Sequence, residues 1–383
     1  MKRNYIAKRF QSSGAGLSLD TEALAKYKDI IDLSIGDTDF TTDESIIDAA
    51  FRDAKAGHTH YGDPKGDPEL IDAVCRAWEE DFDQRLPRDH VLVSASSCLG
   101  MALVMLAILD PGDEVIVFSP YFPMYREQIE LAGGVCVDVP TYASEDYAID
   151  EARLRAAITP RTKAIVFNNP TNPTGMGYDS GTLELLARVA QEHDLLIAAD
   201  EIYTTYLYEG DFRPIRTLPG MAERTITLNS FSKNFLMTGW RVGVIIAEPE
   251  LLAVMNRVNG SLIYSAPSVS QRAAIQALAM RKEIREKYIT AYRDRIFYSA
   301  DRIERLPYLS LVRPKGTFYL FPGVEKTGLD EKAFCKVLLD QAHVLVSPGT
   351  PFGVSAAGHF RIACTVGIDQ LKTAFDRMEK LSF

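Results

Sequence analysis

The stretch that decides the fold is residues 225–246, TITLNSFSKNFLMTGWRVGVII. Its two ends, 225–228 and 242–246, are apolar runs rich in β-branched residues, which is typical of buried strands. The loop between them carries Ser230, Lys233 and Arg241 beside further hydroxyl and glycine residues. Because open α/β sheets bind ligands in loops at strand ends, we expect a binding site here.

The residue types in this loop favour a phosphate-bearing aldehyde that is held covalently. A lysine forms a Schiff base when nearby cations or burial lower the pKa of its ammonium group, and Arg241 stands eight residues after Lys233. The alternative is that both are solvated surface side chains, which is the usual state of lysine and arginine. The sequence around the other strand ends decides between these readings.

Short β-branched runs alternate with helix-like segments from residue 90 to residue 247. This alternation predicts an α/β fold with a mostly parallel, seven-stranded sheet between helices. The expected strands are 91–93, 114–118, 135–139, 164–167, 195–199, 225–228 and 242–247. Apolar residues at helical spacing predict helices over 101–109, 125–132 and 182–192.

The pattern of expected helices and strands changes after Pro267, which predicts a second, smaller domain. Long charged helical sequence runs over 271–305, and short strands are expected over 316–321 and 359–364. A separate helix is expected over 20–28 near the amino terminus. We therefore expect a large cofactor-binding domain over 42–270 and a small α+β domain formed from both chain ends, 1–41 and 271–383.

Composition restricts the classes of partner. The 383 residues carry a formal net charge of -10 without a block of like charges, which argues against nucleic acid or anionic membranes as partners. Five scattered cysteines show no metal-ligand spacing, so we expect no metal site and a reducing, cytoplasmic location. The amino terminus lacks the apolar core of an export signal, and the longest apolar stretch, 101–109, is too short to span a membrane.

Polar sequence follows three other expected strands. Ser96, Ser97 and Cys98 open a helix, where unpaired backbone N–H groups and the helix dipole attract anions. Asn172 stands in the stiff turn NNPTNPTG, residues 168–175, which suits an amide presented at a fixed place. Asp200 closes a buried strand and therefore needs a cationic partner such as a protonated ring nitrogen. Each of these segments also has a purely structural alternative: a simple N-cap for Ser96, a plain turn around Asn172 and a capping role for Asp200.

Together these motifs closely resemble the fold-type I pyridoxal phosphate enzymes, specifically the class I aminotransferases related to aspartate and aromatic aminotransferases. The resemblance runs from about residue 30 to the carboxyl end. It implies that Lys233 of the S-x-S-K motif bonds to pyridoxal 5'-phosphate and that Asp200 of the D-E-x-Y motif pairs with the pyridine nitrogen. It implies that Tyr203 and Asn172 bind the phenolic oxygen of the ring, and that Phe122 stacks on the ring.

The resemblance also assigns the two ends of the site. It implies that the phosphate is bound by the helix-start loop, a serine, an arginine and a tyrosine from the partner subunit, which here are Ser96, Ser97, Cys98, Ser230, Arg241 and Tyr61. For the substrate carboxylate it implies Arg361, helped by Asn172 and the backbone of Gly36. The planar fork of Arg361 matches a carboxylate bidentately, and its apolar neighbours indicate a sheltered setting.

Two departures leave the substrate side chain open. Cys98 stands where some aspartate-using members carry a basic residue, and Phe122 replaces a frequent tryptophan. Candidates for lining an apolar or an acidic side-chain pocket are equally supported: Tyr5, Phe10, Tyr264 and Phe352 for the first, and Lys8, Arg9 and Arg257 for the second.

The leading hypothesis is an aminotransferase that moves an amino group between an L-amino acid and a 2-oxo acid in two half-reactions, with a role in amino acid metabolism and biosynthesis. A carbon–sulfur β-lyase is the alternative, because the same carbanion can expel a β-substituent; the Thr238-Gly239-Trp240-Arg241 run favours transfer. A non-catalytic regulator would need an added nucleic-acid-binding domain and a basic surface, which the composition does not support. Either enzyme is expected to be a homodimer, since Tyr61 is to serve a partner's site.

Overall fold

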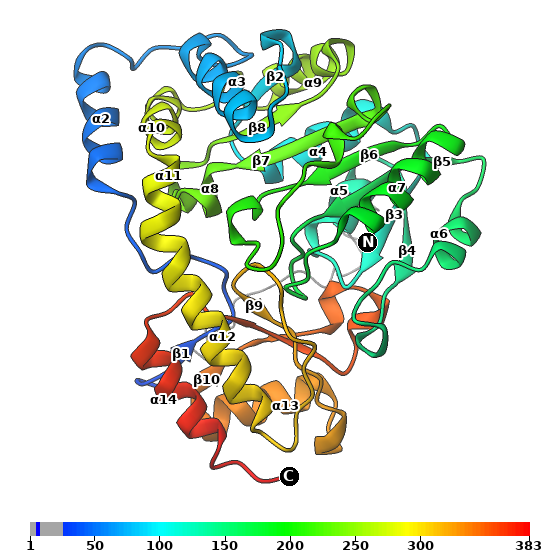
Figure 1. Ribbon diagram of the computed structural model, residues 1–383, viewed down its shortest axis with the longest axis vertical. Helices are drawn as coiled ribbons and strands as arrows, with labels where there is room; N and C mark the ends of the chain where they lie inside the picture. The colour runs from blue at the N-terminus through cyan, green and yellow to red at the C-terminus, as the bar shows by residue number, and fades with distance from the viewer. Residues whose placement is uncertain (1–4, 8–25) are drawn as a thin grey trace.

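The computed structural model describes residues 5–7 and 26–383, and its centre is a seven-stranded sheet (Figure 1). The strand order is β2-β8-β7-β6-β5-β3-β4, and only β8 runs against its neighbours within this sheet. The strands are β2 (Val91–Ser94), β3 (Glu114–Ser119), β4 (Val135–Pro140), β5 (Thr162–Asn168), β6 (Leu196–Asp200), β7 (Thr225–Ser230) and β8 (Gly243–Ile246). The predicted α/β fold and its seven strands are confirmed, with ends that differ by one or two residues.

Helices cover both faces of this sheet. Successive strand residues point to opposite sides, so continuous apolar strands place apolar side chains on both faces, and both must be buried. Val115 and Val117 of β3 pack in a cluster with α4 (Ser97–Ile108), α5 (Met124–Leu131) and α9 (Pro249–Leu262). Ile116 and Phe118 pack on the other face in a cluster with α6 (Glu151–Ala157) and α7 (Ser180–Glu192). The continuous apolar strands are therefore explained by a sheet that is buried on both faces.

A second apolar core lies below the sheet in Figure 1 and combines residues near the amino-terminal end of the chain with residues of its carboxyl-terminal part. Strand β1 (Ile31–Asp32) pairs in parallel with β10 (Val344–Leu345), and β12 (Phe360–Ala363) pairs with β9 (Tyr319–Leu320) and β11 (Ser347–Pro348). Helices α12 (Thr290–Glu304), α13 (Glu331–Val337) and α14 (Ile368–Met378) surround these short strands. Most of the helix expected over 20–28 lies outside the described residues.

The helical stretch expected over 271–305 is interrupted. It comprises α10 (Ser268–Ala279), the short α11 (Arg281–Ile284), a π-helical turn (Arg285–Ile289) and α12. Helix α10 packs with α2 (Glu44–Lys55) and α3 (Pro68–Phe82), and its alanines share a core cluster with strand β2. The strands expected over 316–321 and 359–364 are shorter than predicted, and Thr317 with a φ of 58° bends the chain just before β9. The limits of the two expected domains stay a prediction.

Candidate active site

A cavity of about 1050 Å³ opens at the carboxyl ends of the parallel strands. Loops that follow five strands of the sheet meet strand β12 and the segment after β1 there. Every predicted site residue except Tyr61 lines it: Gly36, Ser96, Ser97, Cys98, Phe122, Asn172, Asp200, Tyr203, Ser230, Lys233, Arg241 and Arg361. The tertiary structure thus brings together residues that are up to 325 positions apart, from Gly36 to Arg361.

Lys233 lies in the one-turn helix α8 (Phe231–Asn234), directly after β7. Its ammonium donates a hydrogen bond to the backbone carbonyl of Gly36. Burial lowers the pKa of Lys233 to about 8, the carboxylate of Asp37 opposes this shift, and the nearby cations Arg361 and Arg241 add to it. A buried amine with a pKa near neutrality is suited to bond with an aldehyde and to exchange protons.

Asp200 ends strand β6 and is 6% exposed. Its Oδ2 accepts a hydrogen bond of 2.5 Å from the phenol of Tyr125, whereas Oδ1 has no hydrogen-bond partner among the described residues. Burial raises the pKa of Asp200 to about 6, although the hydrogen bonds from Tyr125 and from the backbone of Ile202 lower it. A buried carboxylate oxygen without a partner fits a protonated ring nitrogen, which would supply the missing donor and charge.

The opposite end of the cavity is built to hold an anion. Ser96 caps helix α4 by accepting from the N–H of Leu99 at 3.1 Å, and Ser230 caps α8 by accepting from the N–H of Ser232 at 3.1 Å. Arg241, in the left-handed region at a φ of 54°, donates to the carbonyl of Thr238 at 2.7 Å. Two helix starts and one guanidinium therefore converge on a site that fits a phosphate.

Arg361 of β12 is 4% exposed, in agreement with the sheltered setting predicted from its neighbours. It donates to Oδ1 of Asn172 at 3.0 Å and to the carbonyl of Ser34 at 2.6 Å. Its guanidinium lies 4.6 Å from the ring centroid of Tyr319 and 5.0 Å from that of Phe352. Its Nε has no hydrogen-bond partner among the described residues, so this buried cation has bonding capacity for a carboxylate.

The sequence reasoning missed three tyrosines of the cavity: Tyr27, Tyr125 and Tyr319. Tyr125 follows Phe122 by three residues at the start of α5, so the helical spacing was a signal that it lies on the same side. Tyr319 comes from β9, and its hydroxyl lies 3.1 Å from that of the buried Tyr203. An added Cβ at Gly36 would stand 1.8 Å from the Tyr319 hydroxyl, so a glycine is required there for close approach.

Tyr61 lies outside the cavity of its own chain. Its side chain is 87% exposed, and its ring contacts that of Tyr264 with centroids 5.1 Å apart. The other described candidates for a side-chain pocket, Tyr5, Tyr264, Phe352 and Arg257, do not line the cavity either. Phe352 instead packs against the guanidinium of Arg361. Lys8, Arg9 and Phe10 lie outside the described residues.

Comparisons with known proteins identify the family. The family model described as aminotransferase class I and II matches residues 28–378. The chain belongs to this aminotransferase family. A relative from Thermus thermophilus, an aspartate/prephenate aminotransferase, is 38% identical over 92% of this chain and 91% of its own. An arginine–pyruvate transaminase from Pseudomonas aeruginosa is 34% identical over 99% and 97% of the two chains.

Solved structures agree with this assignment. The aspartate aminotransferase from Thermus thermophilus with maleate superposes with a TM-score of 0.92 at 35% identity, and the match covers 99% of this chain and 100% of that one. The protein is therefore a pyridoxal phosphate-dependent aminotransferase that exchanges an amino group between an L-amino acid and a 2-oxo acid by a ping-pong mechanism. The relatives named here are aminotransferases or transaminases, and nothing in them supports the lyase alternative.

Two features are absent from the part of the chain that the structure describes. Within 5–7 and 26–383, no helix is both long and apolar enough to cross a membrane. The same residues contain no cluster of histidine, cysteine, aspartate or glutamate side chains that could hold a metal ion.

Proposed function

We propose that this aminotransferase holds pyridoxal 5'-phosphate in the described cavity, with Lys233 as the covalent anchor and Asp200 as the partner of the ring nitrogen. The single observation that carries the proposal is the buried Oδ1 of Asp200, which has no hydrogen-bond partner among the described residues and lies in the same cavity as the ammonium of Lys233. Tyr203 and Asn172 hold the phenolic oxygen, and Phe122 stacks on the ring. Tyr125 orients the carboxylate of Asp200 through its 2.5 Å hydrogen bond.

The phosphate end of the proposal rests on the two helix starts. Backbone N–H groups of Ser97 and Cys98 and the hydroxyls of Ser96 and Ser230 would donate to the phosphate oxygens, and Arg241 would balance their charge. These donors and the guanidinium make the phosphate end of the cavity positive, whereas the carboxylate of Asp200 makes the ring-nitrogen end negative. The opposite charges at the two ends give the cofactor one orientation in the cavity.

Arg361 is proposed to bind the α-carboxylate of the amino acid and of the 2-oxo acid. Its guanidinium is already held between Tyr319 and Phe352, so little side-chain entropy is lost on binding. The side-chain amide of Asn172 and the backbone of Gly36 complete this part of the site. These contacts recognise the part that all amino acids share.

Bound pyridoxal phosphate supplies an electron sink for the α-carbon of the substrate. Lys233, as a free amine, would move the α-proton of the substrate with its Nζ. Burial favours the neutral amine and so prepares Nζ for accepting that proton. Arg361 fixes the carboxylate and thereby keeps the α-carbon within reach of Nζ.

The enzyme is further proposed to be a cytoplasmic homodimer in amino acid biosynthesis, in which Tyr61 binds the phosphate in the partner subunit. Its exposure away from its own cavity supports a role in another chain. The proposed division is a large domain, 42–270, and a small domain, 1–41 and 271–383. Two separate apolar cores, one around the sheet and one around β1, β10 and β12, support it.

A panel of amino donors tests the proposed function. The names of the relatives cover an acidic donor and a basic donor, so both classes and aromatic amino acids belong in the panel. Purified enzyme loaded with the cofactor is mixed with each amino acid, and the visible absorbance of the lysine-bound cofactor is followed. We expect at least one donor to convert it to pyridoxamine phosphate and 2-oxoglutarate to restore it. Release of pyruvate and thiol from cystathionine, without amino transfer, would contradict the proposal.

A further inference from the structure

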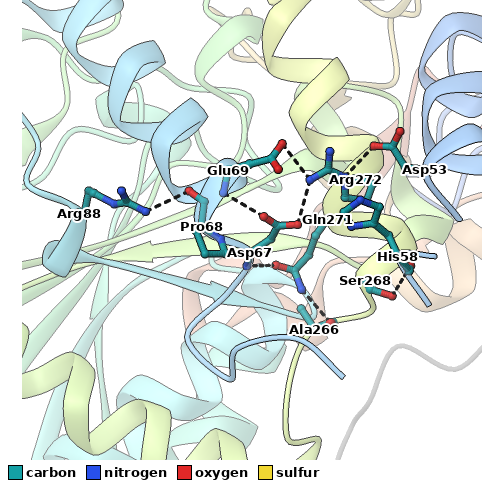
Figure 2. A network of polar contacts seen from close by, with 10 residues as sticks. All are labelled: Asp53, His58, Asp67, Pro68, Glu69, Arg88, Ala266, Ser268, Gln271 and Arg272. Carbon is teal, nitrogen blue, oxygen red and sulfur yellow. Dashed lines mark hydrogen bonds and ion pairs between the residues drawn. The ribbon is translucent and has the colours of Figure 1, made fainter. Parts of the chain in front are cut away.

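A polar network holds the segment that carries Tyr61 against helix α10 (Figure 2). This segment, residues 58–67, connects α2 to α3, and its central residues 59–63 are exposed. At one end, Ser268 Oγ donates to the carbonyl of His58 at 3.0 Å. At the other end, Gln271 Oε1 accepts from the backbone N–H of Asp67 at 2.6 Å. The first turn of one helix therefore holds both ends of the segment.

Arg272 lies at the centre of this network, and Figure 2 shows its guanidinium among three carboxylates. Its Nε donates to Asp53 Oδ2 at 2.7 Å, and its Nη1 lies 3.2 Å from Asp67 Oδ2 and 3.1 Å from Glu69 Oε2. Asp53 belongs to α2, whereas Asp67 caps α3 and Glu69 stands in its first turn. A single guanidinium thus ties together the two helices that flank the segment.

Most of this network is sheltered, with Glu69, at 65% side-chain exposure, as its outer member. The side chain of Arg272 is 11% exposed, and Gln271 is 2% exposed, with its Nε2 donating to the carbonyl of Ala266 at 2.9 Å. Gly66 packs so closely on β2 that an added Cβ would stand 2.3 Å from Cγ2 of Val93. Side chains held this way have little freedom, and sheltered ion pairs are screened less than exposed ones.

We propose that Ser268, Gln271 and Arg272 are positioning residues that hold Tyr61 ready for the phosphate site of the partner subunit. This inference rests on the role proposed above for Tyr61. A phenol supplied by another chain binds well only when its segment is ordered before contact, since ordering it on binding costs free energy. The contact of Tyr61 with the ring of Tyr264 supports the same orientation.

The test measures cofactor affinity in four variants of the full-length enzyme. Tyr61→Phe is expected to weaken pyridoxal phosphate binding roughly tenfold, as for the loss of a hydrogen bond to a charged group. Arg272→Gln is expected to weaken it roughly three- to tenfold. The double variant is expected to bind no more weakly than Tyr61→Phe alone, because Arg272 acts through the Tyr61 hydroxyl.

Arg281→Gln is the matched control. Arg281 follows α10 closely, is 17% exposed in its side chain, and pairs with Glu80 and Asp81 of α3 without a contact to the 58–67 segment. Its loss should lower the melting temperature and leave cofactor affinity at the parental value. Where Arg272→Gln does not fold, Ser268→Ala replaces it in the comparison of the single variants with the double variant that includes Tyr61→Phe.

The outcomes separate the positioning role from the role of Tyr61. If Tyr61→Phe weakens binding while Arg272→Gln and Ser268→Ala behave like Arg281→Gln, the positioning role is wrong and the proposed role of Tyr61 stands. If Tyr61→Phe binds the cofactor like the parent, both are wrong. Additive effects of Arg272→Gln and Tyr61→Phe would also contradict positioning, because they would show that Arg272 acts on binding by another route.

Discussion

Lys233 and Asp200 show how burial prepares two ionisable groups for opposite tasks. Burial lowers the pKa of the ammonium to about 8 and raises that of the carboxyl to about 6, because a low-dielectric surrounding disfavours the charged form of each. Neither group has an ion-pair partner of opposite sign within 4 Å in the described part of the chain. Both therefore carry an energetic cost that a bound cofactor would relieve.

Lys233→Ala is expected to remove the visible absorbance of lysine-bound cofactor and to lower turnover by a factor of at least about 1000, because both the covalent anchor and the proton-moving amine are lost. Absorbance spectra and borohydride reduction, with circular dichroism as the check on folding, measure this. A borohydride-fixed adduct on another lysine of the variant would show that Lys233 is the wrong anchor.

Asp200→Asn is expected to stabilise the cofactor-free protein above pH 6 while it lowers activity. Because the folded-state pKa of Asp200 lies above the ordinary aspartate value of 3.8, the native carboxyl binds a proton that the unfolded chain releases, so stability falls as pH rises between 3.8 and about 6. The amide removes this cost, which is on the order of 2–3 kcal/mol.

Denaturant unfolding of the cofactor-free parent and the Asp200→Asn variant at pH 4 and pH 7.5 measures the difference. We expect nearly equal stability at the lower pH and a more stable variant at the higher pH. Equal stability at both values would mean that Asp200 is not destabilised by burial in the folded protein.

At the scale of elements, the site is a set of loops held by one sheet edge. β2, β3, β5, β6 and β7 run in the same direction, so the residues after them converge even though the chain visits them in separate βα units. The start of α4 packs closely against β8, and Gly243 of β8 allows this close packing. An added Cβ at Gly243 would stand 2.8 Å from the backbone nitrogen of Ser97 and 2.9 Å from the carbonyl oxygen of Asn229.

Gly243→Ala is expected to destabilise the fold by roughly 1–3 kcal/mol, since backbone atoms on both sides would have to move. It should also weaken cofactor binding, because the displaced residue Ser97 belongs to the anion site. Thermal unfolding and a cofactor titration measure the two effects. Gly181→Ala, at the exposed start of α7 with only an ordinary contact at 3.5 Å, is the control; it should leave cofactor binding unchanged and should not destabilise the fold.

At the scale of the molecule, the cavity lies where the core around the sheet and the core around β1, β10 and β12 meet. Lys233 comes from the first part, Arg361 from the second, and the segment after β1 touches both through Gly36 and Ser34. Tyr61 is the one predicted site residue that does not line this cavity, and its side chain is 87% exposed. We propose that Tyr61 serves the site of the partner subunit, in which case each site is assembled from two chains.

Hybrid dimers test this proposal. Tyr61→Phe subunits keep Lys233 and lack the phenol, whereas Lys233→Ala subunits keep the phenol and lack the anchor. Mixed, dissociated and reassociated, they should form heterodimers in which one of the two sites is intact, so cofactor affinity close to that of the parent returns in that site. The recovered affinity is measured as the gain in activity at low cofactor concentration. No gain over the separate variants, in a mixture proved to exchange subunits, would contradict a shared site.

The sequence predicted the strands well because most are largely apolar runs buried on both faces, and local composition is enough to mark such a run; β4 is the more exposed strand at one edge. It predicted less well where tertiary contacts override local preference. The helical stretch over 271–305 breaks at Met280 because α10 packs against α2 and α3, while the later part packs over the second core. Tyr319 carried no local signal, since its partners Tyr203 and Arg361 are far from it in the chain.

The sequence by itself determined the α/β class, the order of the strands along the chain and the chemistry carried at their ends, because apolar runs and short motifs are local. Only the tertiary structure decided that the 225–246 stretch, through Lys233 and Arg241, shares one cavity with Arg361, and that Oδ1 of Asp200 has no partner among the described residues. It also decided that Tyr61 is exposed and does not line the cavity of its own chain. These facts depend on distances between residues remote in sequence, which packing sets and composition does not encode.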